Sequence, residues 1–316
     1  MSSRTTVPPG ATQAIDATLS EPVSGRPRWH GHSYNRAGLY RLAERLSVVP
    51  RGLRLTLARQ IGRLAPRVLP AERHAIRKAL GLITGASAGQ LDALTARLFR
   101  DFAMCFADLV STNRQPAARL STLVESVTGA EQFDNVPGGI VTVTAHVGNW
   151  ELAGRLLANR LARRTHVVVS PEEAPELERW VRRDGEGMRF VPRAHPGVGL
   201  ELLAALRRGE VVALQADRAL GNGGDVWIPF FGVPAPFPLG PFLLAGAARA
   251  AVVPAFCVLD RRYRYAVSIA TPITVRRGEE EAGARAWVAL LESVVREHPT
   301  QWFNFFDVWN PFGCRA

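Results

Sequence analysis

The sequence predicts an α/β protein with a mainly parallel central sheet flanked by helices and preceded by an N-terminal helical segment. From about residue 135 onward, short apolar runs of strand length alternate with longer runs of helix length. This alternation is typical of β-α-β units, which build parallel sheets covered by helices on both faces. Upstream of that point the apolar residues recur at helical spacing.

Length and composition fit a globular protein with a sizeable core. The chain has 316 residues, of which 47% are hydrophobic. Residues 1–28 are rich in Ser, Thr, Pro and Gly and contain no apolar run like that of a signal peptide, so we expect a disordered tail. We expect a single domain over residues 29–316, with a helical part at 29–125 and an α/β core at 135–311.

Two Arg-rich amphipathic segments follow the tail, and Pro50 separates them. Their apolar residues recur at helical spacing: Leu39, Leu42 and Leu46 in the first, then Leu53, Leu57, Ile61 and Leu64 in the second. Basic amphipathic helices of this kind can lie in a membrane interface. Their apolar stripes can equally pack on the body of the protein, and the sequence leaves both interpretations open.

The remaining elements are expected in the following order along the chain. Helical periodicity predicts helices over residues 71–83, 87–110, 149–161, 174–183, 197–209, 239–250 and 283–299. Short apolar runs rich in Val and Ile or in aromatic residues predict strands over residues 138–145, 165–170, 188–191, 210–216, 226–231, 251–259 and 263–275. Ligands of such sheets bind at the carboxyl ends of the strands.

The charge of the chain indicates which kinds of partner it can bind. The net charge of +11 predicts an anionic partner, which is a lipid headgroup, a nucleic acid or a phosphorylated substrate. No nucleic-acid-binding motif accompanies that charge, so we expect no nucleic acid partner.

Three widely spaced cysteines fit buried thiols in a reducing compartment. The longest apolar run, at 239–259, is interrupted by Arg249 and Pro254, so we expect no transmembrane span there.

A histidine ends one of the expected strands, and a glutamate follows it five residues later. In AHVGNWE, His146 would lie in the turn and Glu151 in the first turn of the next helix. Gly148 gives the turn freedom, and Asn149 is a good N-cap. The carboxylate of Glu151 could then hold one imidazole nitrogen and leave the other as a general base. The alternative is a buried, hydrogen-bonded histidine near a helix-capping acid.

A second candidate set follows the strand expected at 210–216. Asp217 and Arg218 lie at its carboxyl end, where an arginine could bind a phosphate. A turn with local hydrogen bonds explains the pair equally well. The Pro- and Phe-rich run at 228–238 could line a hydrocarbon groove or fill the core. In the aromatic C-terminal run at 298–311, core packing is the simplest explanation, although interleaved polar residues suggest one polar face near a cavity.

These blocks resemble those of a known family. AHVGNWE is similar to the H-x4-D/E block of the lysophospholipid acyltransferase superfamily, in the form found in lipid A late acyltransferases and phosphatidylinositol mannoside acyltransferases. The runs at 216–218, 228–245 and 301–309 resemble a related bacterial branch of predicted acyltransferases. The match extends in order from Leu98 to Pro311.

The resemblance implies transfer of a fatty acyl group from an acyl carrier protein or CoA thioester to a hydroxyl or amine of a membrane lipid or glycolipid. It implies His146 as the base and Glu151 as its orienting partner, with no cofactor and no metal. Other residues of the matching blocks become candidates for substrate binding: Asn149, Asp217, Arg218, Phe231, Gly232 and Gly240. The FPEG-type block of glycerolipid enzymes is missing, since FPLG is the nearest string, so glycerol 3-phosphate is not the expected acceptor.

The resemblance also implies a peripheral position on the cytoplasmic face of the bacterial inner membrane. We expect attachment to an anionic membrane surface through the Arg-rich helices rather than through a hydrophobic N-terminal anchor.

Three alternatives belong to other classes. GASAG at 85–89 satisfies the G-x-S-x-G pattern of serine hydrolases, but a helix precedes it where a strand is needed, so Ser87 is expected in a turn between helices. A basic nucleic-acid-binding protein would explain the charge. A non-catalytic lipid-binding protein of the same fold would need no complete pair of His146 and Glu151.

Overall fold

A computed structural model of the protein describes residues 45, 49–112, 115, 117–160, 163–169, 187–221 and 223–312. The expected tail, most of the first amphipathic segment, the helix expected at 174–183 and Cys314 lie outside these residues. The two other cysteines, Cys105 and Cys257, are buried free thiols, as expected.

The central sheet has seven strands in the order β1-β9-β8-β2-β5-β3-β4. All neighbouring strands are parallel except β8 and β9, which are antiparallel, so the prediction of a mainly parallel sheet is confirmed. The strands are β1 (Val124–Thr128), β2 (Ile140–Thr144), β3 (Thr165–Val169), β4 (Met188–Pro192), β5 (Val211–Gln215), β8 (Ala251–Leu259) and β9 (Tyr265–Ile269).

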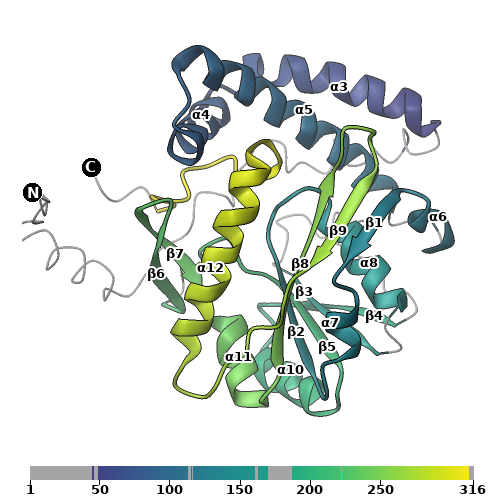
Figure 1. Ribbon diagram of the computed structural model, residues 1–316, viewed down its shortest axis with the longest axis vertical. Helices are drawn as coiled ribbons and strands as arrows, with labels where there is room; N and C mark the ends of the chain where they lie inside the picture. The colour runs from purple at the N-terminus through teal and green to yellow at the C-terminus, as the bar shows by residue number, and fades with distance from the viewer. Residues whose placement is uncertain are drawn as a thin grey trace, which may run out of the picture.

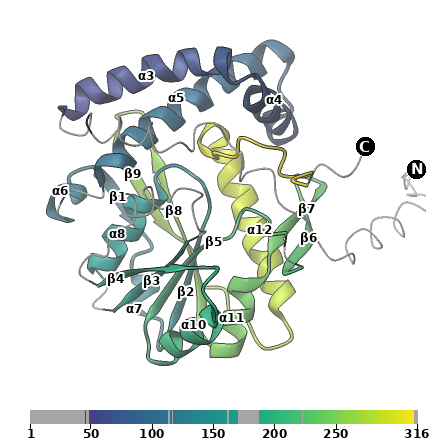
Figure 2. The ribbon, with the colours of Figure 1, turned by 180° about the vertical axis from the view of Figure 1, so that it is seen from behind.

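Helices lie on both sides of this sheet (Figures 1 and 2). One side carries α10 (Val198–Arg207), α11 (Gly240–Ala248) and α12 (Glu280–Glu297), and the other carries α8 (Trp150–Arg160). The central strand β2 is buried on both faces. Val141 and Val143 pack in the cluster that contains α10 to α12, and Ile140 packs in the cluster that contains α8. Burial on both faces fits the composition of β2, in which Ile140, Val141 and Val143 are buried and all five residues are β-branched.

Three helices form a layer across one end of the sheet: α3 (Arg51–Val68), α4 (Pro70–Thr84) and α5 (Ala88–Thr112) (Figure 1). The turn after β8 reaches this layer, where Arg51 Nη2 donates a hydrogen bond to the carbonyl of Tyr263 at 2.7 Å. Because β2 and β8 are parallel, their carboxyl ends face the same layer.

The helix α3 turns the predicted apolar stripe outward. Leu53, Leu57, Ile61 and Leu64 are exposed, and α3 packs inward through a different set of buried residues, among them Leu55, Ala58 and Gly62. The interpretation in which this stripe packs on the body of the protein is therefore wrong. Within the described part of the chain, every helix is too short or too polar to span a bilayer.

Two strands differ from the sequence-based expectation. The strand β1 was not predicted because its sequence, VESVT, is polar and largely exposed at the edge of the sheet. The part of the Pro- and Phe-rich run after residue 231, where no strand was expected, forms β7 (Val233–Pro238), which pairs with β6 (Asp225–Phe230) in a separate two-stranded sheet. Three prolines in β7 argue against a central strand, but they are tolerated where a strand has a free edge. Phe230 and Phe237 of this hairpin are fully buried, so they fill the core.

The other described elements are short. They are α6 (Ala117–Ser121), α7 (Glu131–Asp134) and the 3-10 helix η2 (Pro299–Gln301). The strand expected at 263–275 is confirmed only as β9, and after it Ile273 forms an isolated bridge with Val252.

Candidate active site

His146 lies in the turn between β2 and α8, as the sequence predicts. Backbone hydrogen bonds hold this turn: Gly148 N–H donates to the carbonyl of Gln301 at 2.9 Å, and Phe303 N–H donates to the carbonyl of His146 at 2.7 Å. Gly148 has a φ of 58°. A Cβ atom there would lie 2.0 Å from the carbonyl oxygen of Cys257. The turn that presents His146 therefore requires glycine at this position.

The carboxylate that contacts the imidazole belongs to Asp217, the second residue after β5. Its Oδ1 lies 2.7 Å from His146 Nδ1, and its Oδ2 accepts the His146 backbone N–H at 3.0 Å. The same Oδ2 accepts Trp302 Nε1 at 3.0 Å and Asn304 Nδ2 at 3.1 Å. Asp217 is fully buried. Four N–H groups from two segments of the chain, two of them from His146 itself, thus fix the position of one carboxylate.

The charge states of this pair follow from its surroundings. Burial works against ionisation of Asp217, but the attraction of His146, its hydrogen bonds and the charge of Arg218 together lower the pKa of Asp217 well below its usual range. Burial and the charge of Arg218 lower the pKa of His146 below 6.5, against the opposing effect of Asp217. At neutral pH a neutral imidazole therefore faces a carboxylate. Since that carboxylate can only accept, the proton lies on Nδ1 and Nε2 keeps its lone pair.

Arg218 is held beside the pair by the C-terminal segment. Its Nε donates to Asn304 Oδ1 at 2.7 Å, and its Nη2 donates to the carbonyl of Phe303 at 3.0 Å. Its guanidinium also lies over the ring of Phe306, 5.7 Å from the centroid. Because Asn304 also donates to Asp217, one amide fixes the cation and the carboxylate relative to each other.

Glu151 lies in the first turn of α8, as predicted. Its charge interacts with Arg155, one helical turn further on, and favours the charged form of that arginine against burial, although the pKa of Arg155 is lowered overall. The sequence predicts that Glu151 holds one imidazole nitrogen of His146, and in the structure the carboxylate at Nδ1 is that of Asp217. The role of Glu151 as the orienting partner of His146 stays a prediction.

The other predicted binding residues lie in three places. Asn149 is fully buried and caps α8, where its Oδ1 accepts the Leu152 N–H at 3.2 Å. Phe231 and Gly232 form the two-residue turn of the β6–β7 hairpin, both at positive φ, which is the type I′ geometry. Gly240 is the first residue of α11. Contact of these residues with substrate stays a prediction.

Several residues that shape the site were not among the predicted catalytic and substrate-binding residues, although Gln301, Asn304 and Asp307 were expected on a polar face near a cavity. Trp302 and Asn304 bind Asp217, and the ring of Trp150 lies edge-on to His146 with centroids 4.9 Å apart. The alternation of polar and aromatic residues in QWFNFF was the available signal for the first two. Gln301 in the same run pairs its amide with both backbone groups of Leu259, at 2.7 Å each, and so ties this segment to β8.

The serine hydrolase alternative has no support in the structure. Ser87 lies in the exposed turn between α4 and α5, and its hydroxyl contacts Gln90 Oε1 at 3.0 Å. The expectation that it lies between two helices is confirmed.

The fold and the site together define an α/β protein with a histidine–carboxylate pair at the carboxyl edge of a parallel sheet, poised for general base chemistry. The sequence model of the family "bacterial lipid A biosynthesis acyltransferase" matches residues 39–310, and the chain belongs to this family. The resemblance seen in the sequence is thereby confirmed.

Two curated relatives are similar to the chain. They are the phosphatidylinositol mannoside acyltransferases of Mycobacterium tuberculosis strains CDC 1551 / Oshkosh and ATCC 25618 / H37Rv, each 28% identical over 199 and 198 residues respectively. The matched region is 57% of this chain and 61% of each relative, so the chain spans about three fifths of the length of these proteins.

Proposed function

We propose that the protein transfers a fatty acyl chain from an acyl carrier protein or CoA thioester to a hydroxyl or amine of a lipid or glycolipid acceptor. Family membership and the names of the two relatives support the acyl transfer and the class of acceptor. The observation that carries the mechanism is the hydrogen bond between His146 Nδ1 and Asp217, because it leaves Nε2 available as the base.

In this mechanism, His146 Nε2 takes the proton from the acceptor hydroxyl or amine while its oxygen or nitrogen attacks the thioester carbonyl carbon. The negative charge that develops on the carbonyl oxygen is stabilised by the nearby Arg218 guanidinium. The C–S bond then breaks, and the imidazolium returns the proton to the departing thiolate. Asp217 stabilises the imidazolium during this cycle and keeps the proton of the resting imidazole on Nδ1.

The location of the enzyme is part of the same proposal. An acceptor with hydrocarbon chains lies in a membrane, so the enzyme must reach the membrane surface, and we place it as a peripheral protein on the cytoplasmic face of the inner membrane. The exposed apolar stripe of α3 and the net charge of +11 support that placement. The acyl donors named above are the co-substrates of this proposal, without a metal or a further cofactor.

The test is the turnover of acyl-CoA and of acylated carrier protein by the wild type and by His146→Ala. We expect the variant to stay folded and to lose acyl transfer by roughly 10²–10⁴-fold, the usual contribution of a general base. Ser87→Ala is the matched control and should keep full activity, because Ser87 lies in an exposed turn. Normal turnover by well-folded His146→Ala would remove the mechanism.

A further inference from the structure

The interior strand β5 carries an exposed side chain at its carboxyl end. This strand lies between β2 and β3, and helices cover both faces of the sheet, so its side chains are expected to be buried. Val211 and Val212 are buried, but Gln215, the last residue of the strand, is exposed. No hydrogen bond joins its amide to any residue that the structure describes. A ligand can therefore reach the sheet at this point.

The alternation of side chains places Gln215 on the side of the sheet that carries α8. Val212 and Ala216 pack in the hydrophobic cluster with α10 to α12, whereas Val211 packs in the cluster with α8. Because successive side chains of a strand point to opposite faces, Gln215 points to the same face as Val211. On β2 the same alternation puts Thr144 on this face, in register with Gln215. A hydroxyl and an amide thus lie side by side on two neighbouring strands.

These two residues directly precede the histidine–carboxylate pair of the candidate active site. His146 and Asp217 follow them, each two residues further along its strand. Ala216 N–H still donates to the carbonyl of Thr144 at 2.9 Å, so the two strands stay paired up to this point. Two residues of a strand span only about 6.6 Å. Gln215 is therefore close enough to contact a molecule whose reacting group is bound at His146.

The chemistry of this part of the sheet suits an uncharged ligand. The nearest side chains on the same face are Thr144 of β2 and Ala213 of β5, and neither carries a charge. The ring of Trp150, at the start of α8, lies edge-on to His146 and is only partly buried. An amide both donates and accepts hydrogen bonds, as a hydroxyl group does, whereas a phosphate only accepts. Gln215 therefore favours a ligand that carries hydroxyl groups.

We propose that Gln215 determines acceptor specificity by binding a hydroxyl group next to the group that is acylated, so that the acceptor has a polyol head group such as a sugar. The reacting group lies at His146 Nε2, and its neighbouring hydroxyl lies at the amide of Gln215. The guanidinium of Arg218 is held by Asn304 of the C-terminal segment, so the donor thioester lies on that side of the base and the acceptor on the side of Gln215. This inference rests on the proposed function.

The test compares two acceptors that share an octyl tail, with acyl-CoA as the donor. Octyl glucoside carries several neighbouring hydroxyls, whereas ethylene glycol monooctyl ether carries a single hydroxyl. Gln215→Leu should lower the ratio of the two kcat/KM values, glucoside over monoether, by about three- to tenfold, which is the usual effect of one uncharged hydrogen bond. A raised KM for acyl-CoA at an unchanged ratio would assign the amide to the donor and overturn the proposal.

The matched control is Gln132→Leu. Gln132 belongs to α7, which precedes the amino end of β2, and its side chain also has no hydrogen bond to a described residue. The ratio should keep its wild-type value in this variant. Circular dichroism should show the native fold in both variants, because an exposed side chain such as that of Gln215 contributes little to stability. A ratio that is unchanged in Gln215→Leu, or that falls equally in Gln132→Leu, would overturn the role of Gln215.

Equilibrium binding separates this inference from the proposed function. Titration with octyl glucoside below its micelle concentration, followed by nuclear magnetic resonance, gives a Kd for the wild type and both variants without any turnover. Binding that is weaker in Gln215→Leu by about three- to tenfold supports the role of Gln215. If the same wild type consumes no acyl-CoA, the proposed function fails and the hydroxyl-binding role stands. Equal Kd values in the wild type and Gln215→Leu, or no saturable binding to the wild type, would overturn that role.

Discussion

Asp217 controls the chemistry of His146 through the direction of one hydrogen bond. Three N–H donors converge on its Oδ2, and the Nδ1–H of His146 meets its Oδ1. This arrangement works only with a group that accepts at both oxygens, so an amide of the same shape cannot reproduce it. The identity of the carboxylate therefore decides which imidazole nitrogen carries the proton.

Asp217→Asn is expected to lower kcat by about 10³–10⁴-fold while the fold is retained. The amide oxygen will turn toward the three donors at the Oδ2 position, which leaves the NH2 group facing His146 Nδ1. Nδ1 must then accept, the proton moves to Nε2, and the base is lost, as in serine proteases with the equivalent change. Steady-state kinetics with circular dichroism checks this result. An active, folded Asp217→Asn would show that the tautomer does not matter.

The pH dependence of kcat/KM should report the lowered pKa of His146. The proposed mechanism needs the neutral imidazole, so the rate should rise with pH through the pKa of His146 in the free enzyme and then stay level. Because burial and Arg218 lower that pKa, the acidic limb should lie below 6.5. Since Asp217 opposes this shift, Asp217→Asn should move the residual limb further toward acid.

The variant Glu151→Gln is the control for the pH dependence of kcat/KM. It is not among the groups that shift the pKa of His146, so Glu151→Gln should leave the acidic limb in place whatever its effect on kcat. A shifted limb in Glu151→Gln would instead support the pairing with His146 that the sequence predicts.

At the scale of secondary structure elements, the turn between β2 and α8 depends on a close backbone approach. Gly148 combines a positive φ with a position where any Cβ atom would lie 2.0 Å from the carbonyl of Cys257 on β8. Both features would have to relax in any substituted protein, and either one alone costs about 1–3 kcal/mol. Relaxation would also shift His146, which precedes this residue by only two positions.

Gly148→Ala is therefore expected to lower the free energy of unfolding by about 2–4 kcal/mol and to reduce kcat as well. Gly154→Ala in α8 is the matched control, since nothing lies within 4 Å of its added Cβ atom. That change should be neutral or stabilise the protein by up to about 1 kcal/mol, because alanine favours the helix. Thermal and urea unfolding of both variants provides the measurement. Equal stability of the two would contradict the close approach.

The sequence predicts where helices and strands begin and end better than it predicts which of them lie next to each other in the fold. His146 and Asp217 each follow an apolar strand-like run, so their place at a carboxyl edge could be expected. Their direct contact could not, because it requires β2 and β5 to be adjacent, and periodicity says nothing about strand order. The sequence analysis favoured Glu151 as the partner of His146 because Glu151 is close in the sequence, whereas Asp217 becomes a neighbour only through the strand order. Trp302 and Asn304 come from beyond the last helix, where only their alternation with aromatic residues gave a signal.

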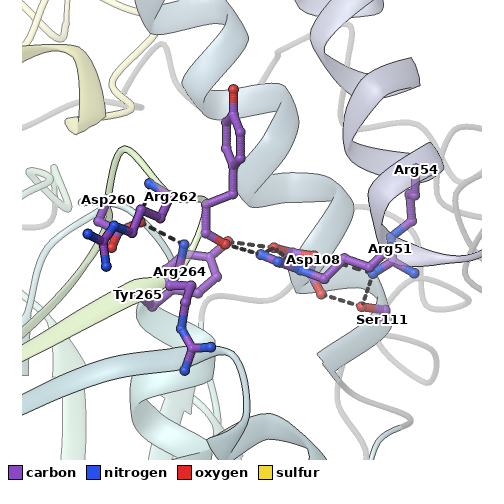
Figure 3. Close-up of polar contacts among 9 residues, drawn as sticks. Arg51, Arg54, Asp108, Ser111, Asp260, Arg262, Arg264 and Tyr265 are labelled. Carbon is purple, nitrogen blue, oxygen red and sulfur yellow. Dashed lines mark hydrogen bonds and ion pairs between the residues drawn. The ribbon is translucent and has the colours of Figure 1, made fainter.

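At the scale of the whole molecule, the site and the exposed apolar stripe of α3 are joined through the layer of α3 to α5. The carboxyl end of β8 reaches α3 through Tyr263, and β2 runs parallel to β8 toward the same layer. The buried Asp108 pairs with Arg51 of α3 at 2.7 Å and connects this layer to β9 through Tyr265 (Figure 3). Removing one partner of such a buried ion pair typically costs about 3–5 kcal/mol, so the network resists reorientation of α3 against the sheet. The exposed stripe of α3, which supports the proposed membrane position, is thus held in a defined position relative to His146.

Because the surface arginines are exposed and the catalytic pair is buried, salt should affect acyl transfer to a membrane acceptor more than transfer to a water-soluble one. Between 0.1 M and 1 M ionic strength the Debye length falls from about 10 Å to about 3 Å, which screens exposed arginines such as Arg262 but hardly affects the buried pair of His146 and Asp217. Transfer to an acceptor in anionic vesicles should therefore fall steeply over this range, while transfer to a water-soluble acceptor changes little. Initial rates with both acceptors, and with neutral vesicles as the control, measure the difference. Parallel loss in all three assays would mean that salt acts on the catalytic site, and the physical separation of membrane contact from chemistry would be wrong.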